Sequence, residues 1–418
     1  MSCLFSRVCM VHQCLNCPGK SNLIEFLHAQ FDDFTNDEIQ FQQWQSTDRT
    51  TIVNMFMSHT EFIEFTACKV DQLTSHSYIA KTQAKYLSLL KIRLPSIPAT
   101  CIVLADFAEN YSMVVQDAVQ GWHWTKQQCT IHPLVMYFTN EQGEVTAKSF
   151  AFFSDDLEHD IGFVYKMQKV FCDHLHSNFA HISSTQYVSD GCAGQYKNYK
   201  NFLNLTYHKQ DFGYHATWNF FATSHGKSPC DAIGGTIKRK LYSESLKRTL
   251  QDHIITPLQA FQFCQKSITA VQFFFISKHD LSPIRTMLKE RYACGNTVPG
   301  TRSFHVFIPL DIGIISYKRT AEDENITGIH NFFQQNPKDS LSHHPKVQDY
   351  VAVQYDDHWW IGLVTESNES QTEIKVRFMS PHGPRKTFFW PVQDDICWVP
   401  QANIIRVLKP LATTSISG

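Results

Sequence analysis

The chain has 418 residues, more than a single hydrophobic core usually holds, so two or three folded units are expected. Hydrophobic residues make up 43% of the chain and charged residues only 18%, a composition that excludes an intrinsically disordered protein. The formal net charge is −2, so bulk charge does not indicate nucleic-acid binding, and any basic surface has to be local.

The sequence favours a soluble, intracellular protein. No apolar run approaches the roughly 18 to 20 residues that a membrane helix requires. The opening stretch MSCLFSRVCMVHQC lacks the apolar centre of a secretory signal. The 13 cysteines, an odd number, fit reduced thiols better than a disulfide framework.

The segment 1–20 is a candidate zinc-binding segment, because cysteines crowd into it and CLNC forms a Cys-x2-Cys knuckle. Structural zinc takes four sulfur or nitrogen ligands in a tetrahedron, and one short turn can present two of them. Free thiols in an unstructured start are the alternative. The candidate ligands are Cys9, Cys14, Cys17 and His12, and Cys68 or His76 could complete the set.

Residues 21–96 are predicted to be helical, because apolar residues recur at steps of three and four, as in SYIAKTQAKYLSLLKIRL. The chain over 97–310 alternates instead: three or four strands come first, followed by a helix, a strand, a helix, a strand and a helix. This order predicts an α/β domain with a mixed sheet flanked by helices. The polar stretch 320–345 is a predicted linker, and five short strands over 346–410 predict a small SH3-like β-barrel.

Three aspartates stand where the predicted α/β domain could hold metal ions. Asp106 closes the apolar run CIVLAD and Asp190 closes QYVSD, so each ends a buried strand. Asp231 lies near the start of a helix, seven residues before Lys238, so the two share a helical face. Carboxylates brought together in this way hold paired Mg²⁺ or Mn²⁺ ions for phosphoryl transfer. A turn former or helix cap is the alternative role of each aspartate.

The segments that carry these acids, LADFAENY, VSDGCAGQYKN and ATSHGKSPCDAIGGTIKR, resemble the three acidic blocks of DDE/DDD transposases and of proteins domesticated from mobile elements. The resemblance covers residues 97–245 and implies an RNase H-like catalytic core, with Asp106, Asp190 and Asp231 as the metal-binding catalytic residues. It further implies DNA as substrate, a nuclear location and a homo-oligomer. The chain departs from the family in having an aspartate as its third acid, where glutamate is commoner, and in offering Glu109 as a competing ligand.

Basic residues flank the acids and are candidates for contact with phosphate. The segment QYKNYKNF also interleaves tyrosine with lysine, a mixture that suits base stacking together with phosphate contact. An amphipathic helix with a solvated lysine face is the alternative for that segment. The predicted phosphate contacts are His225, Lys227, Lys238, Lys197 and Lys200.

Aromatic residues concentrate in the predicted C-terminal barrel, where most of them are expected to build the core. Since the segment also resembles Tudor and other SH3-like chromatin modules, an aromatic cage for methylated lysine is the alternative, with histone tails or other peptides as partners. The cage candidates are Tyr355, Trp359, Trp360 and Phe378.

Two functions are therefore expected. The first is transposase-type, metal-dependent cleavage and transfer of DNA strands. The second is non-catalytic binding of DNA or chromatin by a transposase-derived scaffold.

Overall fold

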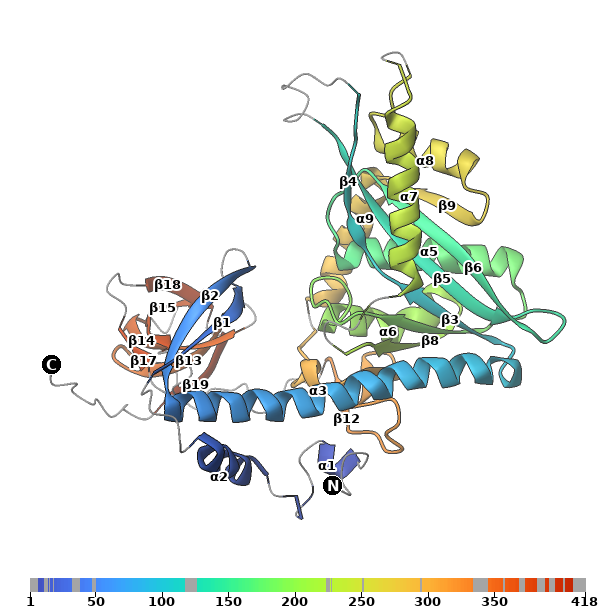
Figure 1. Ribbon diagram of the computed structural model, residues 1–418. Helices are drawn as coiled ribbons and strands as arrows, with labels where there is room; N and C mark the ends of the chain where they lie inside the picture. The colour runs from blue at the N-terminus through green and yellow to red at the C-terminus, as the bar shows by residue number, and fades with distance from the viewer. Residues whose placement is uncertain are drawn as a thin grey trace. The chain divides into compact units, whose positions relative to one another are not determined.

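The computed structural model (Figure 1) divides into two compact units, Met1–Phe333 and Gln334–Gly418. The residues described are 7–10, 14, 16–17, 19–31, 38–46, 50–116, 126–222, 226, 228–249, 252–293, 295–333, 345–355, 358–367, 373–381, 388–390, 395–400 and 403–408.

The first unit begins with helices and a β-hairpin. Its elements are α1 (Arg7–Met10), α2 (Gly19–Phe31), β1 (Glu38–Ser46), β2 (Thr50–Ser58) and α3 (His59–Arg93). The hairpin interrupts the stretch that was predicted to be helical, so that prediction is wrong for both strands. Along β2, TTIVNMFMS, burial alternates residue by residue, but its mate β1, EIQFQQWQS, is rich in good helix formers that hide the alternation.

The long helix α3 has clear start and stop signals. Ser58 Oγ accepts a hydrogen bond from Glu61 N at 3.3 Å, and the Glu61 carboxylate accepts one from Ser58 N at 3.2 Å, so a reciprocal capping box begins the helix. The short 3₁₀ turn η1 (Leu94–Ser96) follows and contains Pro95, which cannot continue the α-helical hydrogen bonding. The helix therefore ends just before Pro95, close to the end of the stretch 21–96 that was predicted to be helical.

A large mixed sheet forms the centre of the first unit. Its order among the described strands is β12-β11-β10-β8-β7-β3-β5-β6-β9, and β4 pairs with β5. β5 runs antiparallel to both β3 and β6, whereas β7 is parallel to β3 and β8 is parallel to β7. The strands are β3 (Thr100–Ala105), β4 (Ala108–Ser112), β5 (Gln128–Thr139), β6 (Val145–Ser154), β7 (Ser184–Ser189), β8 (His215–Phe220), β9 (Val271–Ile276), β10 (Val306–Asp311), β11 (Ile314–Lys318) and β12 (Gly328–Asn331).

Helices cover both faces of the sheet (Figure 1). Along β3, Cys101 and Val103 belong to the core that includes α5 and α6, while Ile102 and Leu104 belong to a core that includes α3 and the start of α7. Burial on both faces explains why this strand is an unbroken apolar run. The helices are α5 (Ile161–Asn178), α6 (Tyr199–Phe212), α7 (Pro229–Ser245), α8 (Pro257–Ser267) and α9 (Lys278–Tyr292), and η2 spans Thr301–Ser303.

The predicted order of strands and helices is confirmed from β3 to α7: four strands, then helix, strand, helix, strand, helix. The first part of the predicted linker 320–345 is folded. Before residue 334 the chain still belongs to the first unit, because β12 pairs with β11, and because Thr320 and Asp323 are buried and hydrogen-bonded to each other. Residues 334–344 lie outside the described residues.

The second unit contains a five-stranded antiparallel sheet in the order β18-β15-β14-β13-β19. Its inner face is apolar and includes Val351, Val364, Ile374 and Val399. Short strands are therefore present over 346–410, as expected, and β13 and β14 pair as a hairpin. The elements are β13 (Tyr350–Tyr355), β14 (His358–Glu366), β15 (Glu373–Phe378), β16 (Ser380–Pro381), β17 (Phe388–Phe389), β18 (Asp395–Pro400) and β19 (Ile404–Leu408).

None of the described helices combines the length and the apolar composition needed to cross a membrane.

Candidate acidic site at the ends of the central strands

Two of the three aspartates end neighbouring parallel strands. Asp106 directly follows β3 and Asp190 directly follows β7. Leu104 is paired with Val188 in the register of the two strands, so the aspartates, each two residues further on, stand at matching positions of one sheet edge. The sequence places both acids at strand ends, and the parallel pairing brings those ends side by side.

The third aspartate reaches the same region from α7. Cys230 Sγ lies 3.5 Å from the backbone oxygen of Leu104, so the first turn of α7 packs against the end of β3. A cavity of about 270 Å³ is lined by Asp106, Asp231 and Lys238, by Glu109, the competing ligand, and by neighbouring residues of β4, β5 and α7. The seven-residue spacing thus does place Asp231 and Lys238 on one helical face, and that face borders the cavity beside Asp106.

Asp231 also caps its own helix. Its Oδ2 accepts a hydrogen bond from the backbone N–H of Ser228 at 2.8 Å and completes a capping box. A carboxylate has two oxygens with several lone pairs, so this bond leaves Oδ1 as a further acceptor. The capping role foreseen as the alternative is present, and it does not use up the side chain.

Asp190 is held close to the segment that leads into α7. Its Oδ1 accepts a hydrogen bond from Cys192 N at 3.2 Å. A Cβ at Gly226 would lie only 2.9 Å from the Asp190 Cβ, closer than real Cβ contacts, so a glycine is required there. Gly234 has a similar role, since a Cβ would lie 3.2 Å from that of Ala108. This glycine lets α7 approach the sheet closely.

The other two acids act electrostatically on Asp106. Burial raises the pKa of Asp106 to about 7, and the negative charges of Asp190 and Asp231 add to the rise. Burial also raises the pKa of Asp190. The three carboxylates do not form a cluster with all ligand atoms within 4.8 Å of one another. In the described part of the chain, one group of three metal-ligating side chains meets that distance, and it consists of cysteines.

His159 stands beside the acidic site, and sequence reasoning missed it. Its ring stacks on the ring of Phe107, the residue after Asp106, with centroids 4.3 Å apart. Its Nε2 lies 2.8 Å from Oδ1 of Asn110, so the neutral ring donates from Nε2 and keeps Nδ1 as an acceptor. Burial lowers the pKa of His159, and the charge of Lys238 lowers it further.

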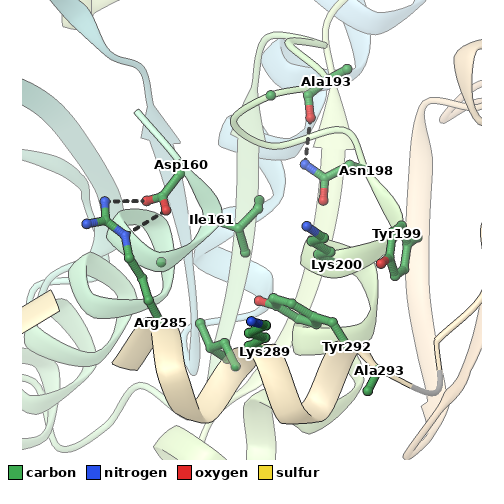
Figure 2. Close-up of a pocket in the computed structure, with 13 residues that line it drawn as sticks. Asp160, Ile161, Ala193, Asn198, Tyr199, Lys200, Arg285, Lys289, Tyr292 and Ala293 are labelled. Carbon is green, nitrogen blue, oxygen red and sulfur yellow. Dashed lines mark hydrogen bonds and ion pairs between the residues drawn. The ribbon is translucent and has the colours of Figure 1, made fainter. Parts of the chain in front are cut away.

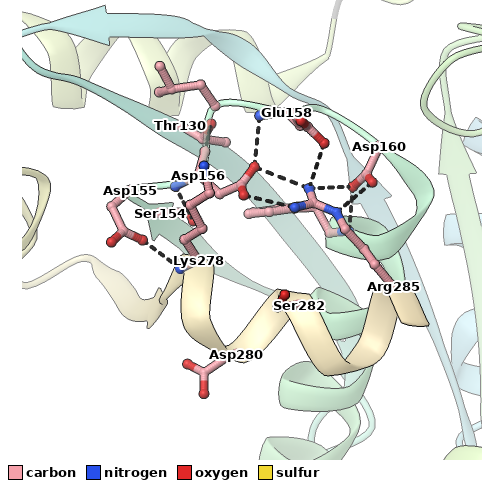
Figure 3. A network of polar contacts seen from close by, with 12 residues as sticks. Thr130, Ser154, Asp155, Asp156, Glu158, Asp160, Lys278, Asp280, Ser282 and Arg285 are labelled. Carbon is pink, nitrogen blue, oxygen red and sulfur yellow. Dashed lines mark hydrogen bonds and ion pairs between the residues drawn. The ribbon is translucent and has the colours of Figure 1, made fainter. Parts of the chain in front are cut away.

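The loop that carries His159 is fixed by a network around Arg285 (Figure 3). The guanidinium of this α9 residue pairs with Asp156 at 2.8 Å, with Glu158 at 3.3 Å and with Asp160 at 2.8 Å. The three acids lie on both sides of His159 in the chain, so one cation holds the whole loop. No sequence motif predicts this network, because Arg285 lies more than a hundred residues after the three acids in the chain.

A buried polar pair lies underneath Phe107. Tyr196 Oη and His132 Nε2 are 2.7 Å apart, and both side chains are fully buried. Burial lowers the pKa of His132 to about 3, so its ring is neutral at physiological pH. Burial raises the pKa of Tyr196, and the charges of Asp106 and Asp190 raise it further. The pair therefore supports the site from below as neutral, hydrogen-bonded groups.

The predicted phosphate contacts divide into four groups. Lys197 is buried, its Nζ donates to the backbone oxygen of Arg302 at 3.1 Å, and burial lowers its pKa to about 8, so its ammonium points into the protein. Lys200 is exposed and lines a pocket of about 680 Å³ with Tyr199 and Lys289 (Figure 2). Lys238 borders the acidic cavity. His225 and Lys227 lie outside the described residues.

The three acids fall within one family match. Residues 83–321, more than half of the chain, match a domain of unknown function (DUF8701). The chain belongs to the DUF8701 family. Residues 3–74 match a second domain of unknown function (DUF8700), so the N-terminal cysteines lie outside the DUF8701 match. No curated protein and no solved structure matches the chain.

Outside the DUF8701 match, Cys9, Cys14 and Cys17 form a group that could bind a metal such as zinc. Their Sγ atoms all lie within 4.8 Å of one another. Cys68, a candidate further ligand, instead accepts a hydrogen bond from Lys20 Nζ at 2.8 Å. His12 lies outside the described residues.

The four cage candidates of the second unit do not share one environment. Trp359 is 56% exposed, and its ring lies 5.9 Å from that of Phe388. Phe378 is buried in the core, and Trp360 packs against that core. The side chain of Tyr355 lies outside the described residues. Trp359 is therefore the candidate that the structure leaves at the surface.

Proposed function

We propose that this DUF8701 chain cleaves and transfers DNA strands in the manner of a transposase, on an RNase H-like core. The proposal is carried by one observation: Asp106 and Asp190 occupy matching positions at the ends of two adjacent parallel strands, and α7 brings Asp231 to a cavity that Asp106 also lines. The mixed sheet, with an antiparallel β3–β5–β6 meander followed by β7 and β8, supports the expected core.

The donor set fits Mg²⁺ or Mn²⁺, the cofactors we propose. Carboxylate oxygens are the ligands that these hard cations prefer. Burial, and after it repulsion from Asp190 and Asp231, raises the pKa of Asp106, and a bound cation would relieve that repulsion. When bound, such ions supply positive charge that stabilises the pentavalent phosphorus and the leaving oxygen.

The side chains have separate roles in the proposed reaction. Asp106 and Asp190 would hold the cations, Asp231 would contribute the oxygen that its cap leaves available, and Lys238 would contact a phosphate of the scissile strand. Water attacks phosphorus, the bond from phosphorus to the 3′-oxygen breaks, and the leaving oxygen takes a proton to become a 3′-hydroxyl. That hydroxyl then attacks a phosphorus of the target strand in line and displaces its 3′-oxygen.

The test is nicking of supercoiled DNA by the full chain with Mn²⁺. We expect Asp190→Ala to reduce nicking by more than about 100-fold, as the loss of a principal electrostatic contributor does in other enzymes. Asp173→Ala is the matched control, because Asp173 is an exposed residue of α5 that pairs with Lys169. Equal nicking by the wild type and Asp190→Ala would contradict the mechanism.

A second function is favoured by the capping bond of Asp231 and by the spacing of the acids. A scaffold that has lost catalysis would still bind DNA or chromatin, and the second unit, which we propose to be an SH3-like barrel, would hold a peptide at Trp359. In that case Asp190→Ala leaves DNA binding unchanged, and the wild type does not nick DNA with Mn²⁺ or Mg²⁺.

We also propose that the three cysteines hold Zn²⁺ for structure and not for catalysis. Thiolates are preferred ligands of zinc and poor ligands of Mg²⁺. The two metal sites would therefore be chemically independent.

A further inference from the structure

Three thiols converge in the first unit, outside the DUF8701 match. The Sγ atoms of Cys9, Cys14 and Cys17 lie within 4.8 Å of one another, and none of the three is in a disulfide. Sulfur atoms bound to one zinc ion at about 2.3 Å, in a tetrahedron, lie about 3.8 Å apart. The thiols are thus already arranged so that small side-chain movements would let them share an ion.

Two contacts attach the described part of the thiol-bearing segment to the rest of the first unit. The Ser75 hydroxyl of α3 donates to the backbone oxygen of Met10 at 3.2 Å, one residue after Cys9. Arg7 pairs with Asp323 at 3.0 Å, and that carboxylate is only 3% exposed. These contacts place α1 against α3 and so restrict which residues can supply a fourth ligand.

A structural zinc site is closed by four ligands, and the described group contains three. On α3, Cys68 is already hydrogen-bonded to Lys20. His76 directly follows Ser75, the α3 residue whose hydroxyl donates to the backbone oxygen of Met10, so this imidazole belongs to the turn of α3 that contacts the thiol segment. Imidazole is a preferred zinc ligand.

We propose that Cys9, Cys14, Cys17 and His76 bind one structural Zn²⁺, which fastens the N-terminal segment to α3. The inference rests on the zinc proposed above and adds the fourth ligand and the role. Because the three thiols lie in the DUF8700 match and His76 lies beyond it, the ion joins that segment to the helix that continues into the DUF8701 match. The binding free energy of the ion then becomes folding free energy of the segment.

Zinc content of the purified full chain is the first measurement, and one ion per chain is expected. Cys14→Ser and His76→Ala should each weaken zinc binding by more than about 100-fold, because loss of a mere outer-shell partner already costs about 10- to 100-fold. Cys68→Ser and His12→Ala are the matched controls, one thiol and one imidazole, and both should keep the ion.

Each outcome has a separate meaning. If Cys14→Ser keeps its zinc, the thiol site is wrong. If His12→Ala loses the ion and His76→Ala keeps it, the fourth ligand is wrong while the thiol site stands. Asp106→Asn should keep its zinc, so failure of the acidic site cannot be mistaken for failure of this one.

The zinc site can also be tested on the wild type, where misfolding of a variant cannot affect the result. Replacement of zinc by Co²⁺ should give the absorption of a tetrahedral ion with cobalt–thiolate charge transfer. Removal of the ion by a chelator should speed hydrogen exchange in residues 7–17 and in the part of α3 around His76, and leave β3 and β7 unchanged. Absence of thiolate charge transfer, or unchanged exchange on both sides of the contact, would overturn the proposal.

Discussion

Replacing Asp106 by asparagine should stabilise the metal-free protein at pH 8. The pKa of about 7 for the folded carboxyl, against about 3.9 for an unfolded one, corresponds to about 4 kcal/mol at full strength. Asp106 is partly exposed, and solvent screening reduces this to about 2 kcal/mol. Asparagine has nearly the same shape but carries no charge, so it escapes the burial cost and the repulsion from Asp190 and Asp231.

The sign follows from linkage. A carboxyl whose folded pKa is raised contributes stability that is fully present below about pH 4 and is lost as the pH rises through about 7. The wild type should therefore lose about 2 kcal/mol between pH 4 and pH 8 at this residue, a loss that Asp106→Asn lacks.

The assay is thermal and urea unfolding of the full chain in a chelator, at pH 5 and pH 8. At pH 8 the variant should melt about 5 °C higher than the wild type, and at pH 5 the difference should shrink. Asp173→Asn, on an exposed face of α5, should change stability by less than about 0.5 kcal/mol at either pH. Mn²⁺ should then stabilise the wild type more than the variant. A variant that melts lower than the wild type at pH 8, with the same pH dependence, would refute the reasoning.

Two further substitutions probe the support of the acidic site. Arg285→Met should lower the free energy of unfolding by about 3 kcal/mol, because it leaves the buried Asp156 carboxylate without its cation. The control Arg248→Met removes a partly exposed pair and should cost under about 1 kcal/mol. Similar losses for the two variants in urea denaturation would contradict this assignment. Gly226→Ala should abolish Mn²⁺-dependent nicking and keep the fold by circular dichroism, because its Cβ would displace Asp190; full nicking would show that this close approach does not matter.

The placement of two acids could be predicted from the sequence, because Asp106 follows the apolar run CIVLA and Asp190 follows the strand-like segment QYVS. Asp106 and Asp190 stand at matching positions because β3 and β7 pair in parallel, and parallel pairing follows from the intervening α5 crossover. Asp231 was foreseen from its seven-residue spacing to Lys238. Its capping bond was the alternative, and the geometry of a carboxylate permits both roles.

The sequence could not indicate His159 or the burial of Lys197. His159 joins the site through stacking on Phe107 and through a loop held by Arg285, and these are contacts between segments far apart in the chain. Lys197 lies in a segment of alternating tyrosine and lysine that suggests a solvated face. Only the packing of β8 and η2 around it decides that its ammonium finds a backbone oxygen.

The hairpin β1–β2 was missed for a different reason. Gln and Met are common in helices, so composition favoured a helix, while the period-two burial of β2 emerges only once its mate is known. A short strand pattern next to a long helical pattern is therefore easily predicted as part of the helix.

The continuity of α3 decides where this chain can be divided for study. The two family matches end and begin at residues 74 and 83, and both positions fall inside this one helix, which spans His59–Arg93. A fragment cut at the family boundary would begin partway along a helix, lose its capping box and expose an unpaired turn. Gln83 is buried, and its side chain is hydrogen-bonded to the backbone of Phe220 and Ala321; in such a fragment it would be the N-terminal residue.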